Sequence, residues 1–341
     1  MATRKVIGGM IPDPPWPARE ACARWSHTNL GDIDSYPMLR ETLEDVLIRF
    51  SRVVFSQVYP GAMTSGATES NLLALLYWRQ KGKKRVLSTR GSHYSIQKAA
   101  SILRMEYREY PINEILDKIN REDVVVVTLG KTEDGGIDDF SILYDIVRKR
   151  NTVIHVDAAY FGTIAQYILK KKLYLDEHIA TLAVDLHKIP EAPPPAGVLY
   201  AYNEDIMRDL WYDSPYIPGK RQFGILGTRP GCSVYAASVS LRIVVEEWPG
   251  GPRGLAEDLE NMIHEISNKL MELDYKVEGG PAPIRCFKHH KIKKIRDYLY
   301  KKGYKVYSCK GNGIRIVAMP HNIWQGYKWI IRELTSAVQE G

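Results

Sequence analysis

The tetrapeptide Asp185-Leu186-His187-Lys188 decides the fold, because it stands where a buried strand is expected to end. The apolar run 180–184 before it is typical of a strand covered on both faces of a parallel sheet. Segment 189–197, which follows, cannot be a helix, because its prolines lack N–H donors and fix φ. A lysine held at a strand end by such a stiff loop can form a Schiff base with an aldehyde cofactor. An ordinary solvated lysine is the alternative interpretation at this point.

The composition indicates a globular protein with room for two cores. The chain has 341 residues, 45% of them hydrophobic, which suffices for a large α/β domain and a smaller one. We recognise no signal peptide and no apolar run near the ~20 residues that span a bilayer, so we expect a cytoplasmic protein without a membrane partner. The net charge of +7 is spread along the chain without an aromatic-basic signature, so we expect no nucleic-acid partner.

The four cysteines are Cys22, Cys232, Cys286 and Cys309, and none of them forms a C-x-x-C pair. Scattered cysteines of this kind favour buried or inert thiols in a reducing cytosol. We therefore expect neither a disulfide framework nor a metal site.

Strand and helix patterns alternate from about residue 53 to 200, which predicts a mainly parallel sheet with helices on both sides. The first 20 residues are rich in proline and predict an extended arm that lies on another surface, such as a partner subunit. The segment Trp248-Pro249-Gly250-Gly251-Pro252 is the best domain boundary, and an α+β pattern follows it. We therefore expect an N-terminal arm (1–36), a large domain (37–248) and a small C-terminal domain (249–341).

A candidate phosphate site precedes the apolar helix that begins near residue 72. Ser65-Gly66-Ala67-Thr68-Glu69 places small residues with free N–H groups at a helix N-terminus, where the helix dipole favours an anion. The hydroxyl of Thr68 adds a donor. An ordinary N-cap by Ser65 or Thr68 explains the same pattern equally well.

Two further polar residues stand at ends of expected strands. His93 lies in a loop that opens a helix, where an imidazole can lie flat on a cofactor ring or simply cap the helix. Asp157 follows the apolar strand 152–156, and the small residues Ala158 and Ala159 after it would let a flat ring approach closely. In open α/β sheets, ligands bind at the carboxyl ends of the strands.

Taken in order, these motifs resemble the pyridoxal-5′-phosphate (PLP) enzymes of fold type I. Among these, the chain is most similar to the group II amino-acid decarboxylases, in particular the archaeal tyrosine/aspartate decarboxylases. The resemblance spans roughly residues 27–245 and rests on five ordered motifs: 64–71, Gly130-Lys131-Thr132 with 135–139, 155–159, 185–188 and Gly227-Thr228-Arg229. It implies an aspartate aminotransferase-like large domain with a sheet of the seven-stranded type. It also implies PLP-dependent decarboxylation of an L-amino acid, with tyrosine, aspartate and glutamate as candidate substrates.

The resemblance also implies roles for single residues. Lys188 would hold PLP as a Schiff base and Asp157 would keep the pyridine nitrogen protonated. His93 would stack on one face of the ring, and Ala159 would pack on the other. The remaining cofactor contacts would come from Ala67, Thr68 and His187 at the phosphate, and from Thr132 near the ring hydroxyl or the substrate carboxylate.

Two implied roles depend on a second subunit or a mobile loop. Thr228 would reach the phosphate from the partner in a homodimer with shared active sites. Tyr216, with Tyr212 as the alternative, would protonate the substrate carbon after CO₂ has left; packing at the dimer interface is the competing explanation. Asp185 departs from the pattern, because some relatives carry a phosphate-binding serine there.

The alternative enzyme function is carbon–carbon bond cleavage. The Asp-x-His-Lys pattern and Gly227-Thr228-Arg229-Pro230-Gly231 are also similar to sphingosine-1-phosphate lyases, which use the same cofactor. A basic protein that binds nucleic acid without catalysis is the third alternative, and it would be colourless, whereas a PLP enzyme is yellow.

Overall fold

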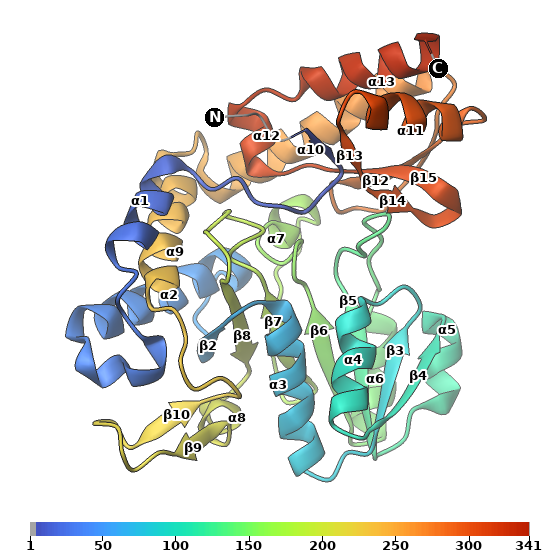
Figure 1. The fold of residues 1–341 in the computed structure, drawn as a ribbon. Helices are drawn as coiled ribbons and strands as arrows, with labels where there is room; N and C mark the ends of the chain where they lie inside the picture. The colour runs from blue at the N-terminus through green and yellow to red at the C-terminus, as the bar shows by residue number, and fades with distance from the viewer. Residues whose placement is uncertain (1–4, 341) are drawn as a thin grey trace.

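Seven strands form the central sheet of this computed structural model, which describes residues 5–340 (Figure 1). Their order is β2-β8-β7-β6-β5-β3-β4. The neighbours β7, β6, β5, β3 and β4 run parallel, whereas β8 is antiparallel to both β7 and β2. The mainly parallel α/β sheet expected from the sequence is confirmed. The strand bounds are β2 (Gly61–Thr64), β3 (Arg85–Thr89), β4 (Glu106–Tyr110), β5 (Asp123–Thr128), β6 (Val153–Asp157), β7 (Ile179–Val184) and β8 (Gly197–Ala201).

Helices cover both faces of this sheet, which explains why every residue of β5, β6 and β7 is buried. Successive side chains of a strand point to opposite faces. Val124 and Val126 of β5 therefore join the cluster under α3, α4 and α8, whereas Val125 and Val127 join the cluster with α2, α6 and α7. The helix bounds are α2 (Pro37–Phe55), α3 (Ala67–Gln80), α4 (Tyr94–Ile102), α5 (Ile112–Ile115), α6 (Ser141–Lys149), α7 (Ala165–Ile168) and α8 (Glu204–Arg208).

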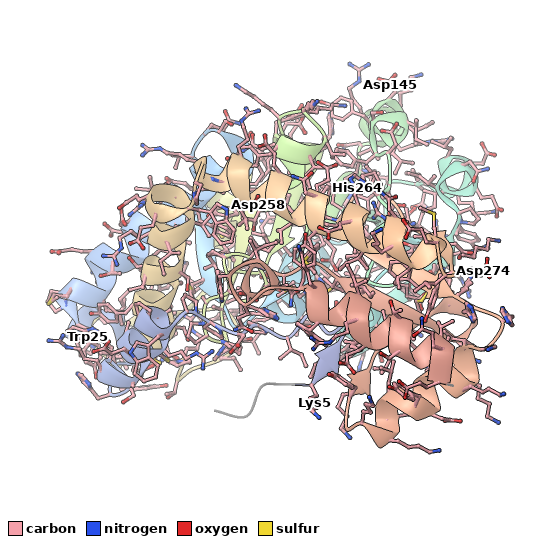
Figure 2. The ribbon with its side chains drawn as sticks, turned by 90° about the horizontal axis from the view of Figure 1, so that it is seen from above. Lys5, Trp25, Asp145, Asp258, His264 and Asp274 are labelled. Carbon is pink, nitrogen blue, oxygen red and sulfur yellow. A yellow bond between two sulfur atoms is a disulfide. The ribbon has the colours of Figure 1, made fainter. Side chains whose placement is uncertain are left out.

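The C-terminal part forms a second, antiparallel sheet in the order β11-β12-β15-β14. Figure 2 shows α10 crossing the molecule from Asp258 past His264 toward Asp274. Strand β12 was missed in the sequence, because Pro281 and Pro283 precede it and suggest a loop. The bounds are α10 (Gly251–Met271), β11 (Lys276–Glu278), β12 (Ile284–Lys288), α11 (Ile292–Lys301), β13 (Lys305–Val306), β14 (Ser308–Cys309), β15 (Gly313–Val317), α12 (Pro320–Trp324) and α13 (Lys328–Glu340).

The N-terminal segment corrects the prediction of an extended arm over the first 20 residues. Residues 5–15 contain no helix, and within them β1 (Val6–Ile7) pairs in parallel with β13 of the same chain. Helix α1 (Trp16–Arg24) then begins one residue after Pro15 and packs on α9 (Cys232–Arg242). Proline is tolerated in the first turn of a helix, so the proline run hides a helix start. The division at residues 36 and 248 stays a prediction.

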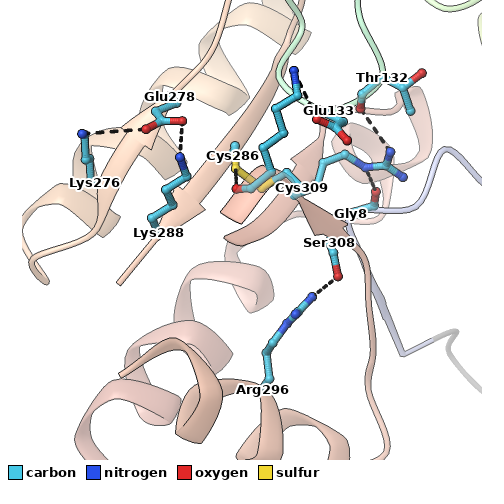
Figure 3. Close-up of a disulfide and its surroundings, with 12 residues drawn as sticks. Gly8, Thr132, Glu133, Lys276, Glu278, Cys286, Lys288, Arg296, Ser308 and Cys309 are labelled. Carbon is cyan, nitrogen blue, oxygen red and sulfur yellow. Dashed lines mark hydrogen bonds and ion pairs between the residues drawn. A yellow bond between two sulfur atoms is a disulfide. The ribbon is translucent and has the colours of Figure 1, made fainter. Parts of the chain in front are cut away.

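The expectation of four free thiols is wrong. Cys286 on β12 and Cys309 on β14 form a disulfide, with their Cα atoms 5.8 Å apart (Figure 3). Both strands flank β15, and a Cβ atom added to Gly313 on β15 would meet the two sulfur atoms at 2.8 and 2.9 Å. The bridge therefore passes over a glycine, and strands that are distant in sequence supply its two ends. Cys22 and Cys232 remain free thiols.

Two short strands project from the body of the molecule at the end away from the C-terminal part (Figure 1). They are β9 (Trp211–Asp213) and β10 (Arg221–Phe223), and they form an antiparallel pair around the segment 214–220. The sequence predicted only a loop here. No helix in residues 5–340 is both long and apolar enough to cross a membrane.

Candidate active site

A cavity of about 180 Å³ lies at the carboxyl ends of the parallel strands. Open α/β sheets bind ligands at this edge. Eight of the residues singled out in the sequence line the cavity together: Ala67, Thr68, His93, Thr132, Asp157, Ala159, His187 and Lys188. They come from five different segments of the chain, so the fold gathers them although they are more than 120 residues apart.

Lys188 is held at the cavity wall by Asp185. Its Nζ lies 2.9 Å from Asp185 Oδ2, whereas Asp185 Oδ1 accepts a hydrogen bond of 2.6 Å from the backbone N–H of Ala67. Burial opposes ionisation of this carboxyl, but Lys188, His187 and the Ala67 N–H outweigh burial, and the pKa of Asp185 is lowered. Asp185 therefore caps the first turn of α3 and holds a cation at the same time.

This contact changes what the helix N-terminus can offer to an anion. The Ala67 N–H is committed to Asp185, so the next N–H of the first turn, that of Thr68, is the one left for a phosphate. His187 stands beside it, and its Nδ1 donates to the carbonyl O of Ala196 at 2.7 Å. That bond places the remaining ring nitrogen, Nε2, on the side of Asp185, 3.5 Å from Oδ2.

Asp157 is buried at the end of β6, with two amide donors around its carboxylate. The side chain of Asn71 donates to Oδ2 at 3.0 Å, and the backbone N–H of Ala159 donates to Oδ1 at 3.2 Å. Burial raises the pKa of Asp157, while Lys188, His93 and Asn71 act in the opposite direction. A carboxylate in this position can accept a hydrogen bond from the protonated ring nitrogen of a bound ligand.

His93 is the N-cap of α4, and its Nδ1 accepts from the backbone N–H of Ser95 at 3.3 Å. Burial lowers the pKa of His93, so its ring is neutral. His93 therefore both caps α4 and lines the cavity, and the hydrogen bond of the cap fixes the orientation of its ring.

Three residues near the cavity were missed in the sequence. Met10 of the N-terminal segment lines the cavity, and Asn71 contacts Asp157 from α3. Arg315 of β15 is buried, and its Nε and Nη1 donate to the carbonyl O atoms of Gly8 and Thr132 at 2.9 and 3.1 Å (Figure 3). No local pattern marks Met10 or Arg315, because both are distant in sequence from the other residues of the site; Arg315 is 183 residues from Thr132.

Two predicted residues lie outside the cavity. Tyr216 is 83% exposed at the tip of the β9–β10 segment. Thr228 is exposed as well, although its neighbour Arg229 is buried and donates from Nη1 to the carbonyl O of Met63 at 2.9 Å. Neither Tyr216 nor Thr228 reaches the cavity of its own chain, so a role for either one requires a second subunit or a movement.

Comparison with known proteins agrees with this geometry. A family model described as the pyridoxal-dependent decarboxylase conserved domain matches residues 47–189. A "Probable L-tyrosine/L-aspartate decarboxylase" of Methanoculleus marisnigri is 30% identical over 344 residues, which cover 93% of this chain and 88% of that protein. A "Probable L-aspartate decarboxylase" of Halobacterium salinarum is 28% identical, with 93% and 91% covered.

Two solved structures show the same fold at low sequence identity. A sphingosine-1-phosphate lyase of Burkholderia pseudomallei has a TM-score of 0.85 at 18% identity, covering 98% of this chain and 85% of its own. A glutamate decarboxylase of Lactobacillus brevis also has a TM-score of 0.85 at 18% identity, covering 99% and 88%. These likenesses confirm the fold expected from the sequence.

Proposed function

The chain belongs to the pyridoxal-dependent decarboxylase family and is a PLP-dependent amino-acid decarboxylase, and we propose that its substrate is L-tyrosine or L-aspartate. Relatives that match over more than nine-tenths of the chain carry these two amino acids in their names. The meeting of Lys188, Asp157 and His93 at one cavity supports the PLP-dependent chemistry, and the names of these relatives carry the choice of substrate. L-Glutamate is a third candidate, which the resemblance also suggests.

The residues around the cavity fit PLP. A lysine amine is available for covalent attachment, a buried carboxylate faces the same space, and a helix N-terminus supplies an N–H for an anionic group. Gly66 and Ala159, two small residues of the cavity wall, leave space for a ligand. At Gly66 there is no room for a side chain, because a Cβ atom would meet His187 Cε1 at 3.0 Å. When bound, PLP supplies an electron-poor ring that accepts the electron pair left by departing CO₂.

Each side chain then has a definite task. Lys188 would hold the cofactor through its amine, and Asp185 keeps that lysine oriented, 2.9 Å away. Asp157 would hold the proton of the ring nitrogen, His93 and Ala159 would lie against the two ring faces, and Thr132 would lie near the ring hydroxyl. Thr68 and His187 would hold the phosphate, with Ala67 acting through its bond to Asp185.

The positive charge for a substrate carboxylate is offered by Arg315. Its guanidinium is buried and donates to the carbonyl O of Thr132, a residue of the cavity wall. Burial lowers the pKa of Arg315, but a guanidinium remains protonated at any physiological pH. A fixed cation bonded to a cavity-wall residue would orient an amino acid by its carboxylate, although Arg315 itself does not line the cavity.

The active form is a homodimer in this proposal. Apolar side chains gather, exposed, around the β9–β10 segment, and exposed apolar patches of this kind mark interaction surfaces. They are Trp211, Tyr212, Tyr216, Ile225 and Leu226, each more than 40% exposed. Thr228 lies in the same region, so a second copy docked there would bring Thr228 to its phosphate site and Tyr216 to its substrate as proton donor, with Tyr212 as the alternative donor.

Carbon–carbon lyase activity is the second candidate, since the lyase from Burkholderia pseudomallei shares the fold. The relatives at 28–30% identity carry decarboxylase names, which favours decarboxylation. A cytoplasmic location also belongs to the proposal. Disulfides such as Cys286–Cys309 are rare in the cytosol outside hyperthermophiles, so the location calls for a direct test.

The function is tested by incubating the PLP-loaded protein with L-tyrosine, L-aspartate and L-glutamate, one at a time, and measuring CO₂ and the matching amine. The same set of incubations includes a phosphorylated long-chain amino alcohol, which tests for lyase activity. Lys188→Ala should abolish turnover and the visible absorbance of bound PLP, whereas Lys131→Ala, at a lysine outside the cavity lining, should keep the absorbance. Normal turnover by Lys188→Ala would refute the proposal.

A further inference from the structure

A chain of buried hydrogen bonds in the large domain runs through Asn71. This side chain lies in the second turn of α3, is fully buried, and belongs to none of the residues that line the cavity. It nevertheless bonds to four side-chain atoms of other elements, either directly or through Ser95. A buried amide with all of its groups used is a fixed object, because each unmade bond would cost desolvation energy.

The orientation of the Asn71 amide follows from its partners. Asp157 Oδ2 lies 3.0 Å away and, as an oxygen of a carboxylate, accepts, so the facing atom is the Nδ2 donor. The same Nδ2 donates its second hydrogen to Ser95 Oγ at 3.0 Å. Asn71 Oδ1 then faces His155 Nε2 at 2.8 Å, and this nitrogen must carry the proton.

The protonation of His155 is fixed at its other nitrogen as well. His155 is completely buried, and burial lowers its pKa to about 3, so the ring is neutral and carries a single proton. With that proton on Nε2, Nδ1 accepts from the hydroxyl of Thr181 at 2.8 Å. The neighbouring strands β6 and β7 thus supply His155 and Thr181, and the neutral ring of His155 donates to Asn71 Oδ1.

The second branch ends on His93. Ser95 Oγ accepts from Asn71, so its own hydrogen points to His93 Nδ1, 2.9 Å away, and the Ser95 backbone N–H donates to the same nitrogen. Two donors on Nδ1 leave the proton of the neutral ring on Nε2. The direction of every bond from Thr181 to His93 is therefore determined.

We propose that Asn71 is a positioning residue that sets two features of the cofactor site at once: the orientation of the Asp157 carboxylate and the tautomer of His93. The inference rests on the proposed function, in which these two groups face the PLP ring. Asn71 occupies Asp157 Oδ2, so Oδ1, which accepts from the Ala159 N–H, is the oxygen left for a ligand in the cavity that Asp157 lines. Through Ser95, Asn71 also keeps the proton of His93 on Nε2. Neither effect requires Asn71 to touch the cofactor.

The test uses two readouts that need no turnover. The first is the dissociation constant of PLP, titrated against PLP-free protein. The second is the tautomer of His93, measured by ¹⁵N NMR of the imidazole in PLP-free protein. Asn71→Leu keeps the side-chain size and removes every bond, and we expect about ten-fold weaker PLP binding and a mixed His93 tautomer.

Further variants separate the two branches. Ser95→Ala should disturb the His93 tautomer and leave PLP affinity within about two-fold, since the bond from Asn71 to Asp157 persists. Asn322→Leu is the matched control: this asparagine is also buried, but its Oδ1 accepts from the Met319 N–H in the C-terminal part, so both readouts should stay at wild-type values. If Asn71→Leu does not fold, Asn71→Ala, which also removes every bond and adds no charge beside Asp157, is measured by the same criteria.

The proposal is overturned if the Asn71 variant retains either wild-type PLP affinity or the wild-type His93 tautomer. Asp157→Asn distinguishes this failure from a failure of the proposed function. If Asp157→Asn weakens PLP binding and the Asn71 variant does not, only the role of Asn71 is refuted. If neither variant weakens PLP binding, the assignment of Asp157 to the ring nitrogen fails as well.

Discussion

Acid should destabilise this protein through one buried imidazole, His155. Burial lowers the pKa of His155 from 6.5 to about 3 in the folded protein. Between those two pH values the unfolded chain binds one proton more than the folded chain, so the free energy of unfolding falls as pH falls. The loss is about 1.4 kcal/mol for each pH unit and about 5 kcal/mol over the whole range. That is comparable to the entire stability of a marginal domain, about 5–15 kcal/mol.

The assay is urea unfolding, followed by tryptophan fluorescence at pH 7.0, 6.0, 5.0 and 4.5, of the wild type, His155→Gln and His264→Gln. Burial also lowers the pKa of His93 and of His289, so both contribute to the wild-type slope. The difference between wild type and His155→Gln isolates His155, whereas His264 is exposed and its variant should follow the wild type. Equal pH slopes for wild type and His155→Gln would refute the reasoning, whatever stability the variant has at pH 7.

Three further predictions follow from single contacts. Asp185→Asn leaves the amine of Lys188 without its carboxylate partner and should lower the free energy of unfolding, measured in urea, by about 3 kcal/mol. Asp209→Asn breaks an exposed ion pair with Lys81 and should change the free energy of unfolding little. Equal effects of the two variants would contradict the role of burial. Thiol titration of the denatured protein should find two reactive cysteines before reduction and four after it; four from the start would exclude the Cys286–Cys309 bond. Tyr216→Phe should bind substrate normally and release less amine per CO₂, and a normal rate and ratio would assign Tyr216 to packing alone.

Local patterns in the sequence were sufficient for the main sheet and for most of the cavity wall. Strands β5, β6 and β7 are continuous apolar runs because helices cover both of their faces, so their identity is written into consecutive residues. Asp157 and Lys188 could be recognised because Asp157 ends one such run and Lys188 stands four residues after another. In a parallel sheet, the carboxyl ends of neighbouring strands meet at one edge, so strand order alone brings these residues together.

Other features depend on pairings between distant segments, for which a sequence has no local signal. Strand β12 is defined by its partner β15 and not by its own alternation, and that pairing in turn brings Cys286 to Cys309 across Gly313. The exposed position of Tyr216 likewise follows from how the β9–β10 segment leaves the body of the molecule.

The clearest contrast lies within one helix turn. The sequence determined that an apolar helix follows the small residues 65–69, because helix periodicity and N-terminal signals are local; we expected its start near residue 72, and α3 begins earlier, at Ala67. Only the tertiary structure decided that the Ala67 N–H bonds to Asp185, and that Asn71, one turn later, bonds to Asp157, 86 residues away. A buried polar group must find a partner wherever the fold supplies one, and that partner is set by packing in three dimensions, which residue spacing does not record.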